Sequence, residues 1–221
     1  MKLDNSLIKR FANNLAQNVN LSNYSWFNLG GNAEYFFKAK DKSELFEFLK
    51  IAKKENLKTT ILGAGSNTLF RDNGVKGVVI KLGANFSFIK LIDKNILEVG
   101  AATLDRKVAN FARDNHLGNL EFLSCIPGSI GGAIIMNSGC YNSDISKVLM
   151  SIKVFDVKKL SEIELKKEDI EFFYRGTNLP KDLIVISAKL KGLVSKKEDI
   201  EKKQMDFIEK RKIAQSSPVK T

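Results

Sequence analysis

The stretch SCIPGSIGGAIIMNSGC, residues 124–140, decides the fold, because four of the 15 glycines of the chain lie in it. Glycine is favoured where the backbone takes a positive φ or presses against another group without a Cβ. Pro127 restricts φ just before Gly128 and favours a turn. The short apolar run 133–136 predicts a buried strand. Residues 137–139 (Asn-Ser-Gly) then end it with turn chemistry.

This stretch can bind an anion without supplying a charge. Exposed backbone amides and the small hydroxyls of Ser129 and Ser138 are suitable donors. One interpretation is a loop that lies against a phosphate or a flat cofactor ring. The other is the tight packing of two backbones, and the residues alone leave both open because glycine-rich turns are common.

Length and composition predict one large or two small domains. The chain has 221 residues, of which 43% are hydrophobic, so it can bury a sizeable core. Its apolar runs all fall short of the roughly 20 residues that span a bilayer. Residues 1–17 contain no apolar core of a secretory signal. We therefore expect a cytoplasmic protein with no membrane partner.

The cysteine and histidine content excludes several kinds of site. Cys125 and Cys140 are not spaced as CxxC, and two thiols do not make a disulfide scaffold, so we interpret them as small reduced thiols. His116 is the single histidine, which rules out a His-rich metal site and the HExxH zinc motif. We expect no metal, and we interpret His116 as a helix-end charge or a solvated side chain.

The chain is basic, with a net charge of +11 from dispersed lysines. Residues 189–221 hold ten basic and five acidic residues and so contribute +5 of this charge. Aromatic residues are not interleaved with these basic ones, and no known nucleic-acid module is present. We expect no nucleic-acid partner, since a basic surface that attracts small anions fits the composition equally well.

The first part of the chain reads as a helix followed by a β–α–β–loop–β unit. Residues 6–17 predict an amphipathic helix with one apolar face, formed by Leu7, Ile8, Phe11 and Leu15. Residues 24–82 predict the β–α–β–loop–β unit, whose helix begins with a capping box of Asp41 and Glu44. This helix should bury one stripe, made of Leu45, Phe48, Leu49 and Ala52.

Further elements follow on both sides of the glycine-rich stretch. We expect a hairpin over 88–100, then a helix capped by Thr103 and ended by Gly118. Strands are predicted over 148–157, 163–165 and 183–190. A capping box at Ser195 should open a charged helix to about Lys212. The last residues, QSSPVKT, read as an extended segment.

A second glycine-rich loop, GAGSNT at 63–68, follows a predicted strand. It has the first two glycines of GxGxxG, but Thr68 replaces the third and the turn residues 72–74 break any helix, so we reject a Rossmann site. A loop with free amides still suits a pyrophosphate or a ribityl chain, and the alternative interpretation is a plain glycine turn. Two such loops suggest one extended ligand held at two places, or two separate turns.

The segment FFYRGT, residues 172–177, places Arg175 behind three aromatic residues and before a turn. A guanidinium recognises a carboxylate or a phosphate through two parallel hydrogen bonds. The alternative is a surface arginine whose stem packs on aromatic rings.

The chain closely resembles the UDP-N-acetylenolpyruvoylglucosamine reductase (UDP-N-acetylmuramate dehydrogenase) family. The resemblance is carried by three motifs that occur in the same order, LGAGSN, IPGSIGGAIIMNSGCY and FYRGT. The resemblance runs from about Ser22 to the last residue. It implies an α+β protein with the two-subdomain FAD-binding fold of the vanillyl-alcohol-oxidase type (PCMH-type). The implied domains are an N-terminal helix (1–21), an FAD-binding domain (22–190, with subdomains of about 22–82 and 83–190) and the start of a substrate-binding domain (191–221).

The resemblance implies a set of FAD-binding residues in the two loops. The pyrophosphate would be held by Gly63, Ala64, Gly65, Ser66 and Asn67. The rest of FAD would be lined by Pro127, Gly128, Ser129, Gly131, Gly132 and Ala133, with Asn137 and Gly139 nearby. Because His116 is poorly placed for a covalent link, non-covalent FAD is expected.

The implied reaction is the NADPH-driven, FAD-dependent reduction of UDP-N-acetylglucosamine enolpyruvate to UDP-N-acetylmuramate in peptidoglycan precursor synthesis. Arg175 maps onto the catalytic arginine of the family, and Tyr174 and Arg175 onto its substrate-binding YR motif. A fixed guanidinium would stabilise the enolate-like charge that builds on the enolpyruvyl carboxylate. We expect a monomer.

Two other functions are considered. One is a different FAD oxidoreductase of the same fold that acts on a small acid, which would show the same flavin spectrum without reducing the enolpyruvyl sugar nucleotide. The other is a non-catalytic basic protein that binds polyanions with a salt-dependent affinity and no flavin. The pair of glycine-rich loops argues against the second, since a polyanion binder does not need them.

The family's proton-donating Ser and its catalytic Glu lie in motifs beyond the position that matches Thr221. We therefore expect the 221-residue chain to bind FAD weakly and not to complete turnover. An assay of UDP-N-acetylmuramate formation by this chain checks the expectation, and robust turnover would contradict it.

Overall fold

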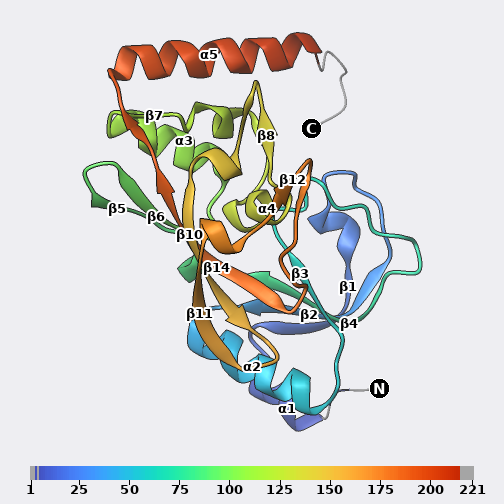
Figure 1. Cartoon of the computed structure of the whole chain (residues 1–221). Coiled ribbons are helices and arrows are strands. Elements are labelled where there is room, and N and C mark those ends of the chain that lie inside the picture. Colours follow the sequence, from blue (N-terminus) through green and yellow to red (C-terminus); the bar gives the residue numbers. More distant parts are fainter. Residues whose placement is uncertain (1–2, 4, 215–221) are drawn as a thin grey trace.

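In the computed structural model, which describes residue 3 and residues 5–214, the first half of the chain forms a four-stranded sheet (Figure 1). Its strands follow the order β1-β2-β4-β3, with β1 antiparallel to β2 and the other neighbours parallel. Its elements are α1 (Asn5–Arg10), β1 (Leu15–Asn20), β2 (Asn32–Ala39), α2 (Lys42–Lys54), β3 (Thr59–Leu62) and β4 (Val75–Leu82).

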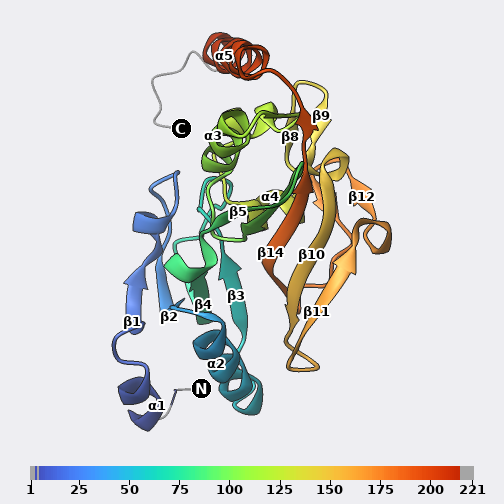
Figure 2. The ribbon, with the colours of Figure 1, turned by 90° about the vertical axis from the view of Figure 1, so that its left-hand side faces the viewer.

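The second half is built on a five-stranded antiparallel sheet in the order β11-β10-β14-β6-β5. Its strands are β5 (Ile89–Asp93), β6 (Ile96–Gly100), β10 (Leu149–Asp156), β11 (Ser161–Lys166) and β14 (Leu183–Lys191). The two sheets stand side by side, with α5 (Lys197–Ala214) across the end of the molecule opposite α1 and α2 (Figure 2).

The glycine-rich stretch belongs to a long excursion between β6 and β10. The excursion contains α3 (Asp105–Asp114), β7 (Leu117–Gly118), α4 (Ile130–Ile135), β8 (Gly139–Cys140) and β9 (Ser143–Asp144). Later elements are β12 (Phe172–Phe173), β13 (Gly176–Thr177), β15 (Leu193–Val194) and α5 (Lys197–Ala214). Short 3-10 turns lie at Leu21–Tyr24, Ala84–Phe86, Glu121–Cys125, Ile145–Lys147 and Lys167–Asp169.

Helix α2 connects the two sheets. Its Phe48 is buried and stacks on Phe37 of β2, with ring centroids 3.9 Å apart. On the other sheet, Phe155 of β10 meets Phe46 edge to face at 5.1 Å. This apolar cluster also includes Ile184 and Ile186 of β14. The burial of large aromatic side chains therefore fixes the two sheets against each other.

A second core lies under the excursion. It joins β6, β10 and β14 to the buried faces of α3 and α4, and Phe207 of α5 closes it at the end of the molecule. Helix α5 buries few of its side chains, namely Ile200, Gln204 and Phe207, and the amide of Gln204 donates to the carbonyl of Ala109 in α3 at 3.0 Å. Within the described range 5–214, no helix is long and apolar enough to cross a membrane.

Most of the predicted elements are confirmed. Asp41 accepts a hydrogen bond from the backbone N–H of Glu44 at 2.9 Å, and α2 buries the four residues expected of it. The β–α–β–loop–β pattern, the hairpin β5–β6 and the strands β10, β11 and β14 are present. The segment QSSPVKT and the side chain of Leu7 lie outside the described residues.

Two of the predicted elements are wrong. The helix expected over 6–17 ends at Arg10, and Leu15–Asn20 instead forms β1, which pairs with β2. The run 133–136 is not a strand, because residues 130–135 form helix α4. A run of four apolar residues is too short to show the period that separates a strand from a helix, and α4 in fact exposes Ile135 while it buries Ala133 and Ile134.

Two helix caps also differ from expectation. Helix α3 begins at Asp105 with Leu104 at the cap position, and the hydroxyl of Thr103 donates to the carbonyl of Phe88 at 3.0 Å. It ends before His116, which takes a left-handed φ of 59° and so breaks the helix ahead of Gly118. The hydroxyl of Ser195 donates to the carbonyl of Leu193 and does not cap α5.

Candidate functional site

The two glycine-rich loops lie against each other. The loop 63–67 follows β3, and the segment 127–133 leads into α4. A Cβ built on Gly63 would lie 2.9 Å from Oγ of Ser129, closer than real Cβ contacts allow. The fold thus brings together two segments that the sequence separates, as the interpretation of one ligand held at two places requires.

The first loop packs closely against residues 24–26 and is hydrogen-bonded to them. Gly65 has a φ of +77°, and a Cβ there would lie 1.9 Å from the carbonyl oxygen of Tyr24. The N–H of Trp26 donates to the carbonyl of Gly65 at 3.1 Å, and the hydroxyl of Ser25 donates to the carbonyl of Thr68 at 2.7 Å. Gly65 is therefore required by both backbone conformation and space.

A cavity of about 500 Å³ opens beside this loop. It combines two aromatic side chains, several small polar groups and one cation, which is the usual character of a small-molecule site. Its lining residues are Asn23, Tyr24, Ser25, Trp26, Asn28, Ala64 and Lys81.

Lys81 is the cation of this cavity, and the sequence analysis missed it. Its Nζ donates to the carbonyl oxygen of Gly63 at 2.6 Å. Burial lowers the pKa of Lys81, and the positive charge of Lys38 on the neighbouring strand lowers it further. The sequence pattern does not single out this residue. It belongs to a predicted strand, GVVIKL, in which a lysine usually indicates a solvated face.

The second loop uses two of its glycines for internal packing. A Cβ on Gly128 would lie 2.5 Å from Oδ2 of Asp105, and one on Gly131 would lie 3.1 Å from the Cβ of Ala101. The N–H of Gly131 donates to the carbonyl of Ala101 at 2.9 Å. At these two positions the missing Cβ allows close packing within the chain, and their contact with FAD stays a prediction.

Gly132 differs from these two. It is exposed in α4, and a Cβ there would meet only Oγ of Ser129, at an ordinary 3.8 Å. Alanine would therefore fit, and it would favour the helix. A glycine at this position suggests that another group approaches the backbone from outside.

Asp105 is a buried carboxylate directly behind Gly128. Its side chain is fully buried, and neither oxygen has a hydrogen-bond partner among the described residues. Burial raises the pKa of Asp105 well above its usual value, because removal from water disfavours the charged form. The sequence analysis missed this residue, since an acidic residue in the first turn of a helix is ordinary.

Asn137 and Gly139 support the neighbouring hairpins. The side-chain amide of Asn137 donates to the carbonyl of Phe173 at 3.3 Å, and its oxygen accepts from the N–H of Ser146 at 3.1 Å. A Cβ on Gly139 would lie 2.3 Å from the carbonyl oxygen of Ser143. Both residues are thus used to place the hairpins β8–β9 and β12–β13.

Tyr174 and Arg175 form the tip of the hairpin β12–β13. Both are exposed, and Arg175 takes a left-handed φ of 59°, which is rare for a long side chain. Its guanidinium carbon lies 5.2 Å from the centre of the Tyr174 ring. The hydroxyl of Thr177 donates to the carbonyl of Ile135 at 3.2 Å, so this hairpin is attached to the end of α4.

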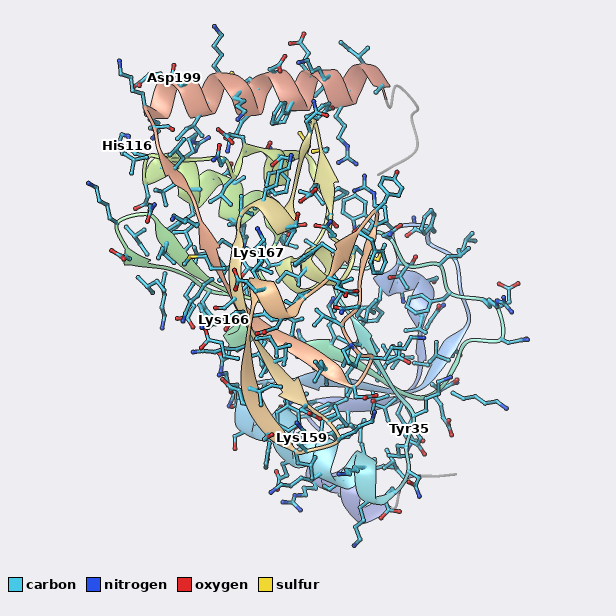
Figure 3. The ribbon with its side chains drawn as sticks, in the orientation of Figure 1. Tyr35, His116, Lys159, Lys166, Lys167 and Asp199 are labelled. Carbon is cyan, nitrogen blue, oxygen red and sulfur yellow. The ribbon has the colours of Figure 1, made fainter. Side chains whose placement is uncertain are left out.

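The cysteines and the histidine have no evident part in this site. Cys125 and Cys140 are free, and the pKa of Cys140 is raised to about 11, mainly by burial. His116 is exposed beside the start of α5, where its carbonyl accepts from the N–H of Ser195 (Figure 3). No group of three or more potential metal ligands occurs in the part of the chain that is described.

A family model described as an FAD binding domain matches residues 33–158, which include both loops. The fold and the paired loops thus define the chain as an FAD-binding protein. Solved structures of distant proteins share the fold: cholesterol oxidase of Brevibacterium sterolicum at 11% identity (TM-score 0.58) and alkyldihydroxyacetonephosphate synthase at 12% (TM-score 0.63). The expected FAD-binding fold of the vanillyl-alcohol-oxidase type is confirmed.

Closer relatives specify the family. The UDP-N-acetylenolpyruvoylglucosamine reductase of Pelagibacter ubique is 41% identical over 97% of this chain and 72% of its own length, and that of Rickettsia felis is 43% identical over 79% and 58%. The crystal structure of the Thermus caldophilus enzyme has a TM-score of 0.77 at 29% identity, over 90% of this chain and 68% of that one. The chain belongs to the UDP-N-acetylenolpyruvoylglucosamine reductase family and spans 58–72% of these relatives' lengths.

Gly132→Ala tests whether a ligand approaches the second loop. We expect the free energy of unfolding of the variant to be about 0.5–1 kcal/mol higher than that of the natural chain, because alanine favours the helix. We expect its FAD affinity to fall by at least tenfold, because the new methyl group lies in the path of the ligand. Urea unfolding and FAD titration measure the two effects. Unchanged FAD affinity would show that no ligand contacts Gly132.

Asp105→Asn tests the buried carboxyl. Between the unfolded pKa of about 3.9 and the raised folded value, native Asp105 holds a proton that the unfolded chain has released. The free energy of unfolding of the natural chain should therefore fall as pH rises through this window. Asparagine does not titrate, so the stability difference between variant and natural chain should shift in favour of the variant from pH 5 to pH 8. Urea unfolding measures this difference. An equal stability difference between variant and natural chain at both pH values would contradict this account.

Proposed function

We propose that this chain takes part in the FAD-dependent, NADPH-driven reduction of UDP-N-acetylglucosamine enolpyruvate to UDP-N-acetylmuramate, a step of peptidoglycan precursor synthesis. The observation that carries the proposal is the closeness of the two loops, where a Cβ built on Gly63 would lie 2.9 Å from Oγ of Ser129. Membership of the reductase family supports the choice of substrate over a small acid.

The residues present fit a non-covalently bound FAD. A loop that exposes backbone amides, with a cation beside it, suits a diphosphate, and the cavity at 24–26 offers the rings of Tyr24 and Trp26. We assign the pyrophosphate to residues 63–67. The rest of FAD is assigned to the segment 127–133, with Gly132 as the position open to it.

In this proposal Arg175 is the catalytic residue. Bound FAD, once reduced by NADPH, would supply the hydride for the enolpyruvyl double bond. Arg175 pairs with the enolpyruvyl carboxylate and stabilises the negative charge that grows there as the double bond is reduced. The hydrogen bonds of Asn137 and Thr177 hold its hairpin to α4, and so to the segment assigned to FAD. The guanidinium carbon of Arg175 lies 5.2 Å from the centre of the Tyr174 ring, within the range of a cation–π interaction.

The proposal includes the setting of the reaction. NADPH and UDP-linked sugars are cytoplasmic metabolites, so the reaction takes place in the cytoplasm. We propose a monomer with these small molecules as partners and without nucleic acid or membrane. The domain limits 22–190 for FAD binding and 191–221 for the start of a substrate domain belong to the same proposal.

A spectral titration tests the function. The chain is loaded with FAD, and the visible flavin band is followed during addition of NADPH and, separately, of the enolpyruvyl sugar nucleotide. We expect NADPH to bleach the band and the sugar nucleotide to perturb it saturably. Bleaching by a small hydroxy acid, with no response to the sugar nucleotide, would favour the alternative oxidoreductase.

Arg175→Met should weaken binding of the enolpyruvyl sugar nucleotide by about 10–100-fold, the usual value of a lost hydrogen bond to a charged group. Arg175→Lys should restore part of this loss, since it keeps the charge but not the two-point geometry. The FAD spectrum of both variants should remain that of the natural chain. Lys181→Met, a change at an exposed position near the same hairpin, is the control. Equal affinity in Arg175→Met would exclude the proposed role.

A further inference from the structure

Lys81 stands where β3 passes into the first glycine-rich loop. It pairs in register with Leu62, the last residue of β3, and its Nζ donates to the carbonyl of Gly63. Within the described residues no ion pair includes Lys81. The ammonium is therefore half-buried next to a loop without a neutralising carboxylate.

The surroundings of Lys81 are unfavourable for its charge in the free protein. Burial removes part of its hydration, and Lys38, its partner in register on β2, adds a second positive charge. A partly desolvated cation beside another cation gains most from a nearby anion, because the attraction is less screened than in water. An ammonium has three donors, and the carbonyl of Gly63 uses one of them.

The residues that line the cavity indicate which ligand can supply that anion. Lys81 lines it together with Ala64 of the loop, and Tyr24 and Trp26 line it as well. A ligand here meets a cation, loop backbone and aromatic rings within one space of about 500 Å³. This combination matches a diphosphate attached to a nucleoside better than an isolated phosphate ion.

We propose that Lys81 supplies the positive charge that binds the diphosphate of FAD, and that it thereby distinguishes FAD from flavins without phosphate. The inference rests on the proposed function, because it takes FAD as the ligand. It adds a charged binding residue to a loop whose own residues, GAGSN, carry no charge.

The test measures binding of FAD and of riboflavin, which lacks phosphate, through quenching of the emission of Trp26, the single tryptophan. Lys81→Met keeps most of the side-chain length and removes the charge, whereas Lys81→Arg keeps the charge. Lys76→Met, an exposed change on the same strand, is the control. Thermal unfolding by circular dichroism verifies that each variant is folded.

We expect Lys81→Met to bind FAD at least tenfold more weakly than the natural chain and riboflavin equally well. Lys81→Arg should recover most of the FAD affinity, and Lys76→Met should behave as the natural chain. The salt dependence of FAD affinity should also be smaller in Lys81→Met, because one charge interaction is lost.

Equal losses for FAD and riboflavin in Lys81→Met would overturn the proposal, because they would mean that Lys81 only holds the carbonyl of Gly63. Unchanged FAD affinity would overturn it as well. If the natural chain binds no flavin, the proposed function fails, and calorimetry with inorganic pyrophosphate still decides the role of Lys81. Binding of pyrophosphate to the natural chain but not to Lys81→Met supports the diphosphate site, and equal binding contradicts it.

Discussion

The structure depends on a close approach of two loops that lie far apart in the sequence. At Gly63 and Ser129 the loop after β3 and the loop before α4 come close, since a Cβ on Gly63 would lie 2.9 Å from Oγ of Ser129 and this hydroxyl would have to turn away. This contact is possible because each loop is fixed from behind, the first by residues 24–26 and the second by Ala101 and Asp105. The two sheets, held by the aromatic cluster around α2, bring these loops to the same place.

The same stretch connects the two parts of the proposed chemistry. Helix α4 carries Gly132 on its exposed side, and its last carbonyl, at Ile135, accepts a hydrogen bond from the Arg175 hairpin. Asn137, directly after the helix, binds the same hairpin. A short helix thus sets the distance between the segment assigned to the cofactor and the arginine assigned to the substrate.

Local signals predicted much of the fold. Helix α2 was predictable because its cap and its buried stripe are both complete within 13 residues. Leu15–Asn20 was not, because its partner strand β2, and not its own pattern, makes it a strand. The run 133–136 was mistaken for a strand because four apolar residues are too few to show a helical period, although the helix buries Ala133 and Ile134 and exposes Ile135.

The sequence predicted the part of the site that consists of glycines or of motifs shared with the family. It did not predict the residues whose type is ordinary for their element but whose burial is unusual. Lys81 and Asp105 are common residues in a strand and in a first helical turn, and only the fold gives them buried positions. Gly128, Gly131 and Gly139 were predicted from the sequence as ligand positions. The fold adds that a Cβ at each would meet neighbouring groups of the chain, which the sequence does not show, and their contact with FAD stays a prediction.

Equilibrium dialysis of the purified chain against FAD, with absorbance at the flavin band as the measure, tests the central claim most directly. If the two loops form one site, the chain binds one FAD per molecule in a saturable manner. A linear, non-saturating uptake, or no uptake at all, would contradict the account of the loops as a flavin site.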